Sequence, residues 1–240
     1  MASTKERCPF CTDLKVLPGV NSFAVEYPDA ARHWSPNNKK TPDQVLHSIK
    51  SSRLWICPTC KGEFSAPAHE MAYGTASCPY CDNRQLLPGF NSLAARYPEI
   101  AKKWSSKNEK TADEHLFNSR TYAIWDCPDC HGEYNALIDE IVAGTYDCPY
   151  CNDRRVLPGF NSFAVRHEDL LKEWDFINNY LLADPDQISE SFATPVWWKC
   201  LNDSSHKYHM SPADRLMFQK RHREPCAYCK GLRRKKRHFV

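Results

Sequence analysis

The sequence is short of glycine and lacks both a long apolar run and an apolar segment near its start. It has 8 glycines but 17 prolines, a balance that favours many short elements over a single deep core. No stretch approaches the roughly 18 apolar residues of a membrane-spanning helix, and the opening MASTKERCPF contains no apolar signal region. We therefore expect a protein that is neither secreted nor membrane-inserted and that stays in an intracellular reducing compartment, the cytoplasm or the nucleus, or is carried in a virion.

Cysteine, by contrast, is abundant, with 13 residues. A reducing compartment keeps thiols reduced, and clustered cysteines there bind metal more often than they form disulfides. The odd number also excludes complete pairing in internal disulfides. Metal binding is therefore the first hypothesis for these thiols.

A repeat runs through most of the chain, with Cys-Pro-x-Cys knuckles that begin at Cys8, Cys78 and Cys148, 70 residues apart. Each knuckle is followed by Leu-Pro-Gly and then by an Asn-Ser-x-Ala block. A tryptophan closes each block, at Trp34, Trp104 and Trp174. The pattern indicates three copies of one unit, of which the third is irregular.

Within each copy the residue types predict short elements. Thr41-Pro42-Asp43-Gln44, with its equivalents at 111–114 and 184–187, has a capping side chain and a Glu or Gln three residues later, which predicts the start of a short helix. An aromatic strand then leads into a cysteine, at 54–56, 123–126 and 196–199. In the first two copies a return strand at 62–64 and 132–134 precedes a short helical segment that ends near Gly74 or Gly144. Each copy should therefore contain a β-hairpin with short helices.

Two copies carry the same ligand string, two Cys-x-x-Cys knuckles separated by 17 residues. This spacing is typical of a zinc site, because each knuckle turns two thiolates toward one ion and two knuckles complete a closed tetrahedron. A filled tetrahedron leaves no position for substrate, so these sites should be structural. The ligands are Cys57, Cys60, Cys78 and Cys81 in the first site, and Cys127, Cys130, Cys148 and Cys151 in the second.

An alternative pairing would join Cys8 and Cys11 to Cys57 and Cys60 across 45 residues, but the shorter loop costs less closure entropy. In the preferred pairing Cys8 and Cys11 form a fourth, partial site. Three interpretations of these two cysteines stay open: they are vestigial, they use His33 or His47 as further ligands, or they complete a site between chains. The string Cys-Pro-Tyr-Cys, at 78–81 and 148–151, is also the glutaredoxin redox motif, although its recurrence with an upstream knuckle at zinc-site distance favours metal.

The third site departs from the pattern because no second cysteine follows Cys200 before Cys226 and Cys229. His206 is the natural substitute, since imidazole is an ordinary zinc ligand, and His209 is its competitor. We therefore expect three structural zinc ions.

Three strings, W-x-C-P-x-C-x-G-E-[FY], G-T-x-x-C-P-Y-C and L-P-G-F-N-S-[FL]-A, resemble the zinc-ribbon domain repeat family of bacterial, phage and large DNA virus proteins. The resemblance covers roughly residues 8 to 230. It implies small α+β zinc modules in tandem, treble-clef or zinc-ribbon-like and stabilised by metal. The expected domains are an N-terminal half-repeat at 1–54, zinc module 1 at 55–124, zinc module 2 at 125–195, an irregular zinc module 3 at 196–230 and a basic tail at 231–240.

Charge is unevenly distributed along the chain. Residues 215–240 hold ten Lys or Arg and one Glu, a net +9, which leaves 22 basic and 28 acidic residues, a net −6, in the first 214. The tail is expected to neutralise phosphates of nucleic acid, unless it is a solvated terminus or a nuclear import signal. Arginines just beyond the knuckles are further candidates, unless they form surface salt bridges. The residues are Arg233, Arg234, Lys235, Lys236 and Arg237 in the tail, and Arg84, Arg154 and Arg155 beside the knuckles.

The tryptophans have two interpretations. Trp34, Trp104 and Trp174 could stack on bases, but packing in the core is favoured because small modules need large aromatic residues to bury enough surface. The hairpin tryptophans, which we expect to shield the zinc thiolates, are Trp55, Trp125, Trp197 and Trp198.

These observations predict a non-enzymatic protein that binds DNA or RNA, with no small-molecule substrate and no membrane partner. The alternative is a structural or assembly protein, a subunit of a virion or ribonucleoprotein particle, whose zinc modules contact other proteins. The acidic body favours that alternative. A nuclease-associated role is a third possibility, because some members of the similar family carry nuclease domains, but His131, His206 and His209 make no convincing catalytic set.

Overall fold

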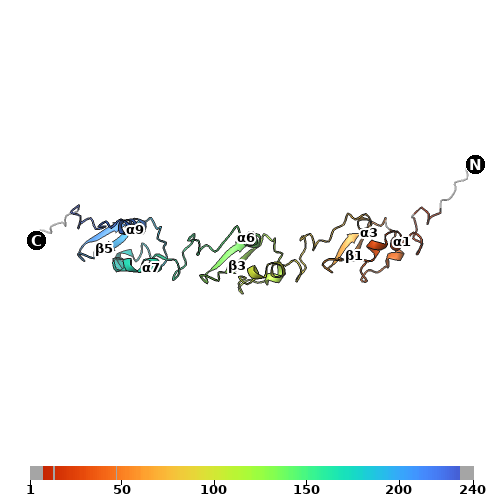
Figure 1. The fold of residues 1–240 in the computed structure, drawn as a ribbon, viewed down its shortest axis with the longest axis horizontal. Helices are drawn as coiled ribbons and strands as arrows, with labels where there is room; N and C mark the ends of the chain where they lie inside the picture. The colour runs from red at the N-terminus through yellow and green to blue at the C-terminus, as the bar shows by residue number, and fades with distance from the viewer. Residues whose placement is uncertain (1–7, 13, 47, 233–240) are drawn as a thin grey trace, which may run out of the picture. The chain divides into compact units, whose positions relative to one another are not determined.

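The computed structural model describes residues 8–12, 14–46 and 48–232. It contains three small modules, each with a two-stranded sheet, short helices and a cluster of four Cys or His residues (Figure 1). The chain divides into two compact units, Met1–Ala123 with Leu137–Ala143, and Ile124–Ala136 with Gly144–Val240. No helix in the described part of the chain is long and apolar enough to cross a membrane.

The first module lies within the first unit. Its hairpin is antiparallel and places Trp55 opposite Phe64, as the aromatic strand predicts. The predicted helix start at Thr41 has both hydrogen bonds of a capping box, but the element is a single 3-10 turn. The elements are α1 (Phe23–Glu26), α2 (Pro28–Ala31), η1 (Pro42–Gln44), β1 (Ser52–Ile56), β2 (Glu63–Pro67) and α3 (Ala68–Ala72).

Aromatic rings form the centre of this module. The ring centroids of Phe23, Trp34 and Trp55 lie 4.9 to 5.6 Å apart in each pair, and the Trp55 indole donates a hydrogen bond to the Ala66 carbonyl at 2.9 Å. The core therefore crosses the boundary expected between residues 54 and 55. The helical block packs with the hairpin that follows it in the chain, because Trp34 and Trp55 make an edge-to-face pair.

The middle module repeats these elements. In the first unit, the capping box at Thr111 and Glu114 is again complete, and Ser92 caps its helix by accepting the Ala95 amide. The Trp104 indole donates to the Lys110 carbonyl at 2.9 Å, as Trp34 does to Lys40. The elements are α4 (Leu93–Arg96), α5 (Pro98–Ala101), η2 (Ala112–Glu114), β3 (Tyr122–Asp126), β4 (Glu133–Leu137) and α6 (Ile138–Ala143).

The third module lies within the second unit and is irregular, as the sequence predicts. Phe163, Trp174 and Trp198 repeat the aromatic centre, so the core also crosses the boundary expected between 195 and 196. The helix predicted at 184–187 is wrong, because this segment is a turn in which the Asp184 carboxylate accepts the Asp186 amide. The elements are α7 (Phe163–Arg166), η3 (Glu168–Lys172), α8 (Phe176–Asn179), β5 (Val196–Lys199), β6 (Lys207–Met210) and α9 (Pro212–Lys220).

A buried ion pair with a hydrogen-bonded tyrosine stabilises this module. The Arg215 guanidinium lies 3.1 Å from a Glu173 carboxylate oxygen, which also accepts the Tyr208 hydroxyl at 2.8 Å. Burial, reinforced by the Glu173 charge, raises the pKa of Tyr208 above its ordinary range. Arg215 therefore belongs to the core, although the sequence places it in the basic C-terminal segment.

Candidate metal centres

Each hairpin of the first two modules ends in a tight knuckle. In the first, the Lys61 amide donates to the Cys57 carbonyl and the Cys57 amide donates to the Gly62 carbonyl, both at 3.0 Å. Lys61 takes a left-handed φ of 60°, and its equivalent His131 takes 55°. These turns direct both thiols of each hairpin knuckle to the same side.

The second knuckle of each site fits closely against the hairpin knuckle. A Cβ added at Gly62 would lie 2.7 Å from the Tyr80 ring, and one at Gly132 would lie 2.6 Å from Tyr150. Only glycine allows this approach. The Tyr80 hydroxyl then donates to the Glu63 carbonyl at 2.8 Å, so the tyrosine of the CPYC knuckle fastens the two knuckles together.

The knuckles bring four sulfur atoms together in each of these sites. The Sγ atoms of Cys57 and Cys81 are 3.6 Å apart, as are those of Cys60 and Cys78. The equivalent separations in the second site are 3.6 and 3.5 Å. Tetrahedral zinc, with bonds of about 2.3 Å to sulfur, places thiolates about 3.8 Å apart. The sulfur positions therefore fit a zinc ion.

The electrostatics of the first site also favour a bound cation. Burial works to raise the pKa of Cys57, but hydrogen bonds from the backbone amides of Cys60 and Thr59 and from neighbouring thiols lower it to about 7. Burial and the surrounding cysteines instead raise the pKa of Cys81 to about 12. The hairpin knuckle stabilises one thiolate, and the negative charge of that thiolate then opposes ionisation of the other thiols. A divalent cation removes this conflict by stabilising all four thiolates.

The third site completes its ligand set with a histidine. His206 Nδ1 lies 3.7 Å from Cys229 Sγ and 4.0 Å from Cys226 Sγ, and Cys200 Sγ lies 3.5 Å from Cys229 Sγ. The Asp203 carboxylate lies 3.3 Å from His206 Nε2 and favours the tautomer that leaves Nδ1 available to a metal. The His209 ring instead lies against the Trp197 ring, with centroids 4.7 Å apart, and takes no part in the cluster.

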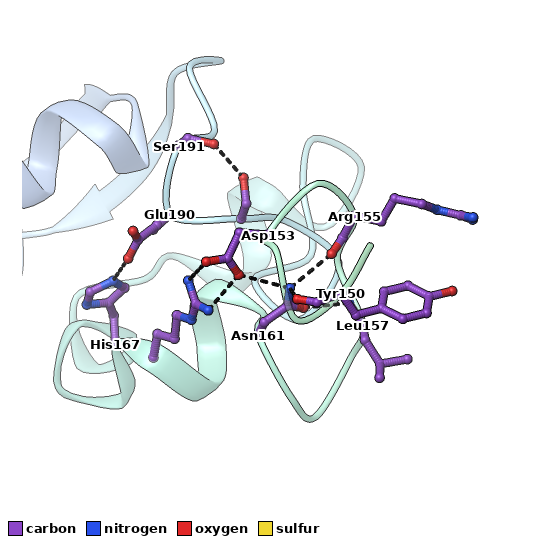
Figure 2. A network of polar contacts seen from close by, with 10 residues as sticks. Tyr150, Asp153, Arg155, Leu157, Asn161, His167, Glu190 and Ser191 are labelled. Atoms are coloured by element: carbon purple, nitrogen blue, oxygen red, sulfur yellow. Dashed lines mark hydrogen bonds and ion pairs between the residues drawn. The ribbon is translucent and has the colours of Figure 1, made fainter. Parts of the chain in front are cut away.

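An asparagine holds in place each of the knuckle loops that begin at Cys8, Cys78 and Cys148, as Figure 2 shows for Asn161. Its side-chain oxygen accepts the Leu157 amide at 2.7 Å, and its Nδ2 donates to the carbonyls of Tyr150 and Arg155 at 2.8 and 2.9 Å. Asp153, which also contacts Asn161, pairs with Arg166 at 2.6 Å. The Arg166 hydrogen bond lowers the pKa of Asp153. The Asn-Ser block therefore ties the knuckle to the helical block that follows.

The remaining residues predicted as binding or metal-site residues do not come together in one site. Arg84 pairs with Asp82 at 2.8 Å, whereas the guanidinium groups of Arg154 and Arg155 lie over tyrosine rings at 4.7 and 5.7 Å. The tail residues 233–237 and His47 lie outside the described residues. Cys8 and Cys11 belong to none of the three clusters within the described ranges.

The hairpin tryptophans do not all shield a cluster. Trp55, Trp125 and Trp198 are fully buried, but the Trp197 side chain faces away from the core and is 36% exposed. The expectation for Trp197 was therefore wrong, because side chains alternate along the strand and Trp198 takes the inward position.

Comparison with known proteins identifies the modules. The family profile described as "Probable Treble clef zinc finger domain" matches residues 30–84, 100–154 and 170–232. The chain belongs to this treble-clef zinc-finger family. Each matched segment contains a repeat tryptophan, a hairpin and both knuckles of one cluster. The three clusters and the treble-clef fold together confirm the prediction of three structural zinc ions.

A viral protein is similar in sequence to part of this chain. An uncharacterized protein of Acanthamoeba polyphaga mimivirus, R635, is 25% identical over 156 residues. The similar segment covers 58% of this chain and 38% of the viral protein, so the chain matches well under two thirds of that relative's length.

Several residues that build the treble-clef sites are not apparent from ligand spacing. Asn21, Asn91 and Asn161 hold the knuckle loops, and Gly62 and Gly132 allow the knuckles to meet. The signal that could have identified them is their recurrence at fixed repeat positions. Asp203 has no such signal, because it belongs to the irregular third loop.

Proposed function

We propose that this treble-clef zinc-finger chain is a non-enzymatic protein that binds nucleic acid through its C-terminal module and the tail that follows. The observation that carries the proposal is a group of exposed cations at the end of α9 and beside the third knuckle. Within the described part of the chain none of them makes an ion pair. The residues are Lys220, Arg221, Arg223 and Lys230.

These cations continue directly into the tail Arg233–Arg237 along the sequence. Together they give a concentration of positive charge suited to phosphates, and nucleic-acid backbones attract such charge without regard to base sequence. Elsewhere, Arg84 beside a knuckle is already paired with Asp82. Arg154 lies over the Tyr146 ring at 4.7 Å, as Lys230 lies over the Phe218 ring at 4.4 Å, and neither ring contact neutralises the charge. The C-terminal module is therefore favoured over the first two as the contact surface.

The absence of catalysis is part of the proposal. Each cluster supplies four ligands to one ion, and a four-coordinate structural zinc has no open position at which water or substrate could be activated. The zinc ions would therefore support the fold and keep the cationic surface in place.

The test is a binding assay with labelled DNA and RNA, single-stranded and double-stranded, at several salt concentrations. The triple variant Lys220→Ala, Arg221→Ala, Arg223→Ala should bind more weakly. The slope of log affinity against log salt should fall by about 0.7 to 0.9 for each phosphate that the variant no longer neutralises. A chain ending at Leu232 should bind more weakly still.

The matched control is the triple variant Arg84→Ala, Arg154→Ala, Arg155→Ala, which removes the same amount of charge. It should bind nearly as well as the wild type. Affinity that survives both the C-terminal substitutions and the truncation would contradict the proposal. Magnesium-dependent cleavage of the probe would contradict its non-enzymatic part.

A second candidate function, assembly with other proteins, is favoured by one observation on the third module. An insertion around α8 exposes five large apolar side chains by 52 to 90%, where the first two modules carry Asn and Lys. Exposed apolar groups of this size mark interaction surfaces. The residues are Phe176, Ile177, Tyr180, Leu181 and Leu182.

A further inference from the structure

The N-terminal CPFC segment is folded as a complete knuckle. The Thr12 amide donates to the Cys8 carbonyl at 3.2 Å, and Asn21 Nδ2 donates to the Phe10 carbonyl at 2.7 Å. The Leu17 amide donates to the Asn21 side-chain oxygen at 2.6 Å. These are the hydrogen bonds that shape the zinc-site knuckles at Asn91 and Asn161, so this knuckle has the form of half a zinc site.

The face of the knuckle that carries the thiols is covered in the internal modules and exposed in the N-terminal knuckle. Cys148 is buried and Cys78 half-buried, whereas Cys8 is exposed. Leu17 is 39% exposed, while its equivalents Leu87 and Leu157 are half-buried because the hairpin glycine packs against them. The N-terminal knuckle therefore presents a face that, in the other copies, contacts a second knuckle.

The ligand count leaves this knuckle incomplete. Eleven of the 13 cysteines, with His206, make up the three clusters, and the two others are Cys8 and Cys11. Among the described residues no group of three or more metal ligands includes either of them, and His33 does not join them. Two thiolates supply half of the four ligands that structural zinc requires.

We propose that Cys8 and Cys11 bind a fourth zinc ion together with the same two cysteines of a second copy of this chain. In the internal sites the first cysteine of one knuckle lies 3.5 to 3.6 Å from the last cysteine of the other. A two-fold axis between identical knuckles produces the same arrangement, with Cys8 beside the partner's Cys11 and Cys11 beside the partner's Cys8. The second copy contributes the only other pair of this kind, because its remaining cysteines fill its own clusters.

The side chains around the knuckle suit a contact with protein. Leu14 occupies the position of Arg84 and Arg154 in the other copies and is 76% exposed. Val20, near by in the chain, is 62% exposed. Replacement of an arginine by an exposed leucine beside the thiols favours burial against a second apolar surface over contact with solvent.

The experiment uses the full chain in reductant, with zinc content, native mass spectrometry and light scattering measured across a range of concentrations. The wild type should form a dimer with about seven zinc ions, three in each chain and one shared, or about 3.5 per chain. The variant Cys8→Ser, Cys11→Ser should be a monomer with about three, and its circular dichroism should match the wild type. Chelation should dissociate the wild-type dimer.

Two single variants control the interpretation. Lys15→Ser changes an exposed side chain of the same loop and should leave the dimer intact, whereas Leu14→Arg keeps both thiols and should weaken it. A wild-type monomer with about three zinc ions at the highest concentration would overturn the proposal. So would a monomer with about four, which would place the fourth site within one chain, and so would a dimer that persists in the double serine variant.

Discussion

Single residues decide whether the two knuckles of a site can meet. At Gly132 an added methyl group would lie 2.6 Å from the Tyr150 ring and 2.9 Å from Leu157. Gly132→Ala is therefore expected to push the CPYC loop away from the hairpin, lower the free energy of unfolding by about 1 to 3 kcal/mol and weaken zinc at the second cluster. Thermal unfolding and competition with a coloured zinc chelator measure the two effects.

Gly159→Ala is the matched control for this substitution. Gly159 has a φ of 77° and no atom within 4 Å of an added Cβ, so its substitution adds left-handed strain of about 1 to 2 kcal/mol without a clash. Its zinc retention should match the wild type. Equal loss of zinc in both variants would show that contact between the knuckles does not govern the site.

A second residue-scale prediction concerns Asp175, whose buried carboxylate lies 2.8 Å from Lys207 Nζ. Burial works to raise its pKa, but hydrogen bonds from Lys207 and Asn178 outweigh burial and hold the pKa below its ordinary value. A pKa lower in the folded than in the unfolded state means that the carboxylate stabilises the fold above the unfolded pKa of about 4. That contribution is lost as the pH falls through the folded pKa.

Asp175→Asn should therefore lower the free energy of unfolding by about 1 to 3 kcal/mol, and the difference from wild type should be constant between about pH 6 and 8. Urea unfolding at several pH values checks this. Asp29→Asn, at an exposed ion pair, serves as the control and should change stability by less than about 0.5 kcal/mol. A difference for Asp175 that grows or shrinks steeply within that pH range would contradict the assignment.

Ligand spacing can predict those residues whose role depends only on nearby residues in the sequence. Two Cys-x-x-Cys pairs that recur at a fixed separation indicate one metal site, so the four cysteines of the first cluster and the four of the second follow from spacing. The choice of His206 over His209 does not, because it depends on which side chain the hairpin turns inward and on the contact between Asp203 and Nε2. The role of Gly132 depends on a contact 18 residues away along the chain, and ligand spacing does not report it.

The CPxC loop is an element without regular secondary structure, and its asparagine takes the place of a hydrogen-bond ladder. Asn161→Ala would leave the Leu157 amide and the Tyr150 carbonyl without their partner. We expect the free energy of unfolding to fall by about 2 to 3 kcal/mol and zinc to exchange faster at the second cluster. Cobalt substitution, read by absorption as zinc displaces it, measures the exchange, and Asn152→Ala on the same loop should behave as the wild type.

The capping sequences show how far element prediction reaches. At Thr41 and Thr111 the predicted reciprocal hydrogen bonds form, but the helix ends after one turn because the chain must reach the hairpin. At 184–187 the cap residue is an aspartate, and its side chain bonds the amide two residues on, so that a turn replaces the helix. Strands were easier to predict, because their inward tryptophans have no alternative place in a small module.

At the scale of the whole molecule, the unit of packing differs from the unit that ligand spacing suggests. Ligand spacing suggests modules that begin at the hairpin, whereas the cores join each helical block to the hairpin after it in the first and third modules. The reason is physical: Trp34 and Trp174 complete cores in which the hairpin alone would leave Trp55 and Trp198 partly uncovered. Long-range pairs of this kind are invisible to a pattern of ligands.

Because the residues of each metal cluster, and of the core beside it, come from one module, loss of one zinc site should unfold one module. Cys226→Ser removes a buried ligand of the third cluster, and coordination supplies about 10 to 16 kcal/mol per structural zinc. Zinc content should fall by about one ion per chain, and hydrogen exchange should show reduced protection in β5 and β6 while β1 and β2 keep theirs. Ser204→Ala, in the same ligand loop, should change neither quantity. Reduced protection in the first hairpin as well would mean that the modules fold as one cooperative body and that their local cores do not set stability.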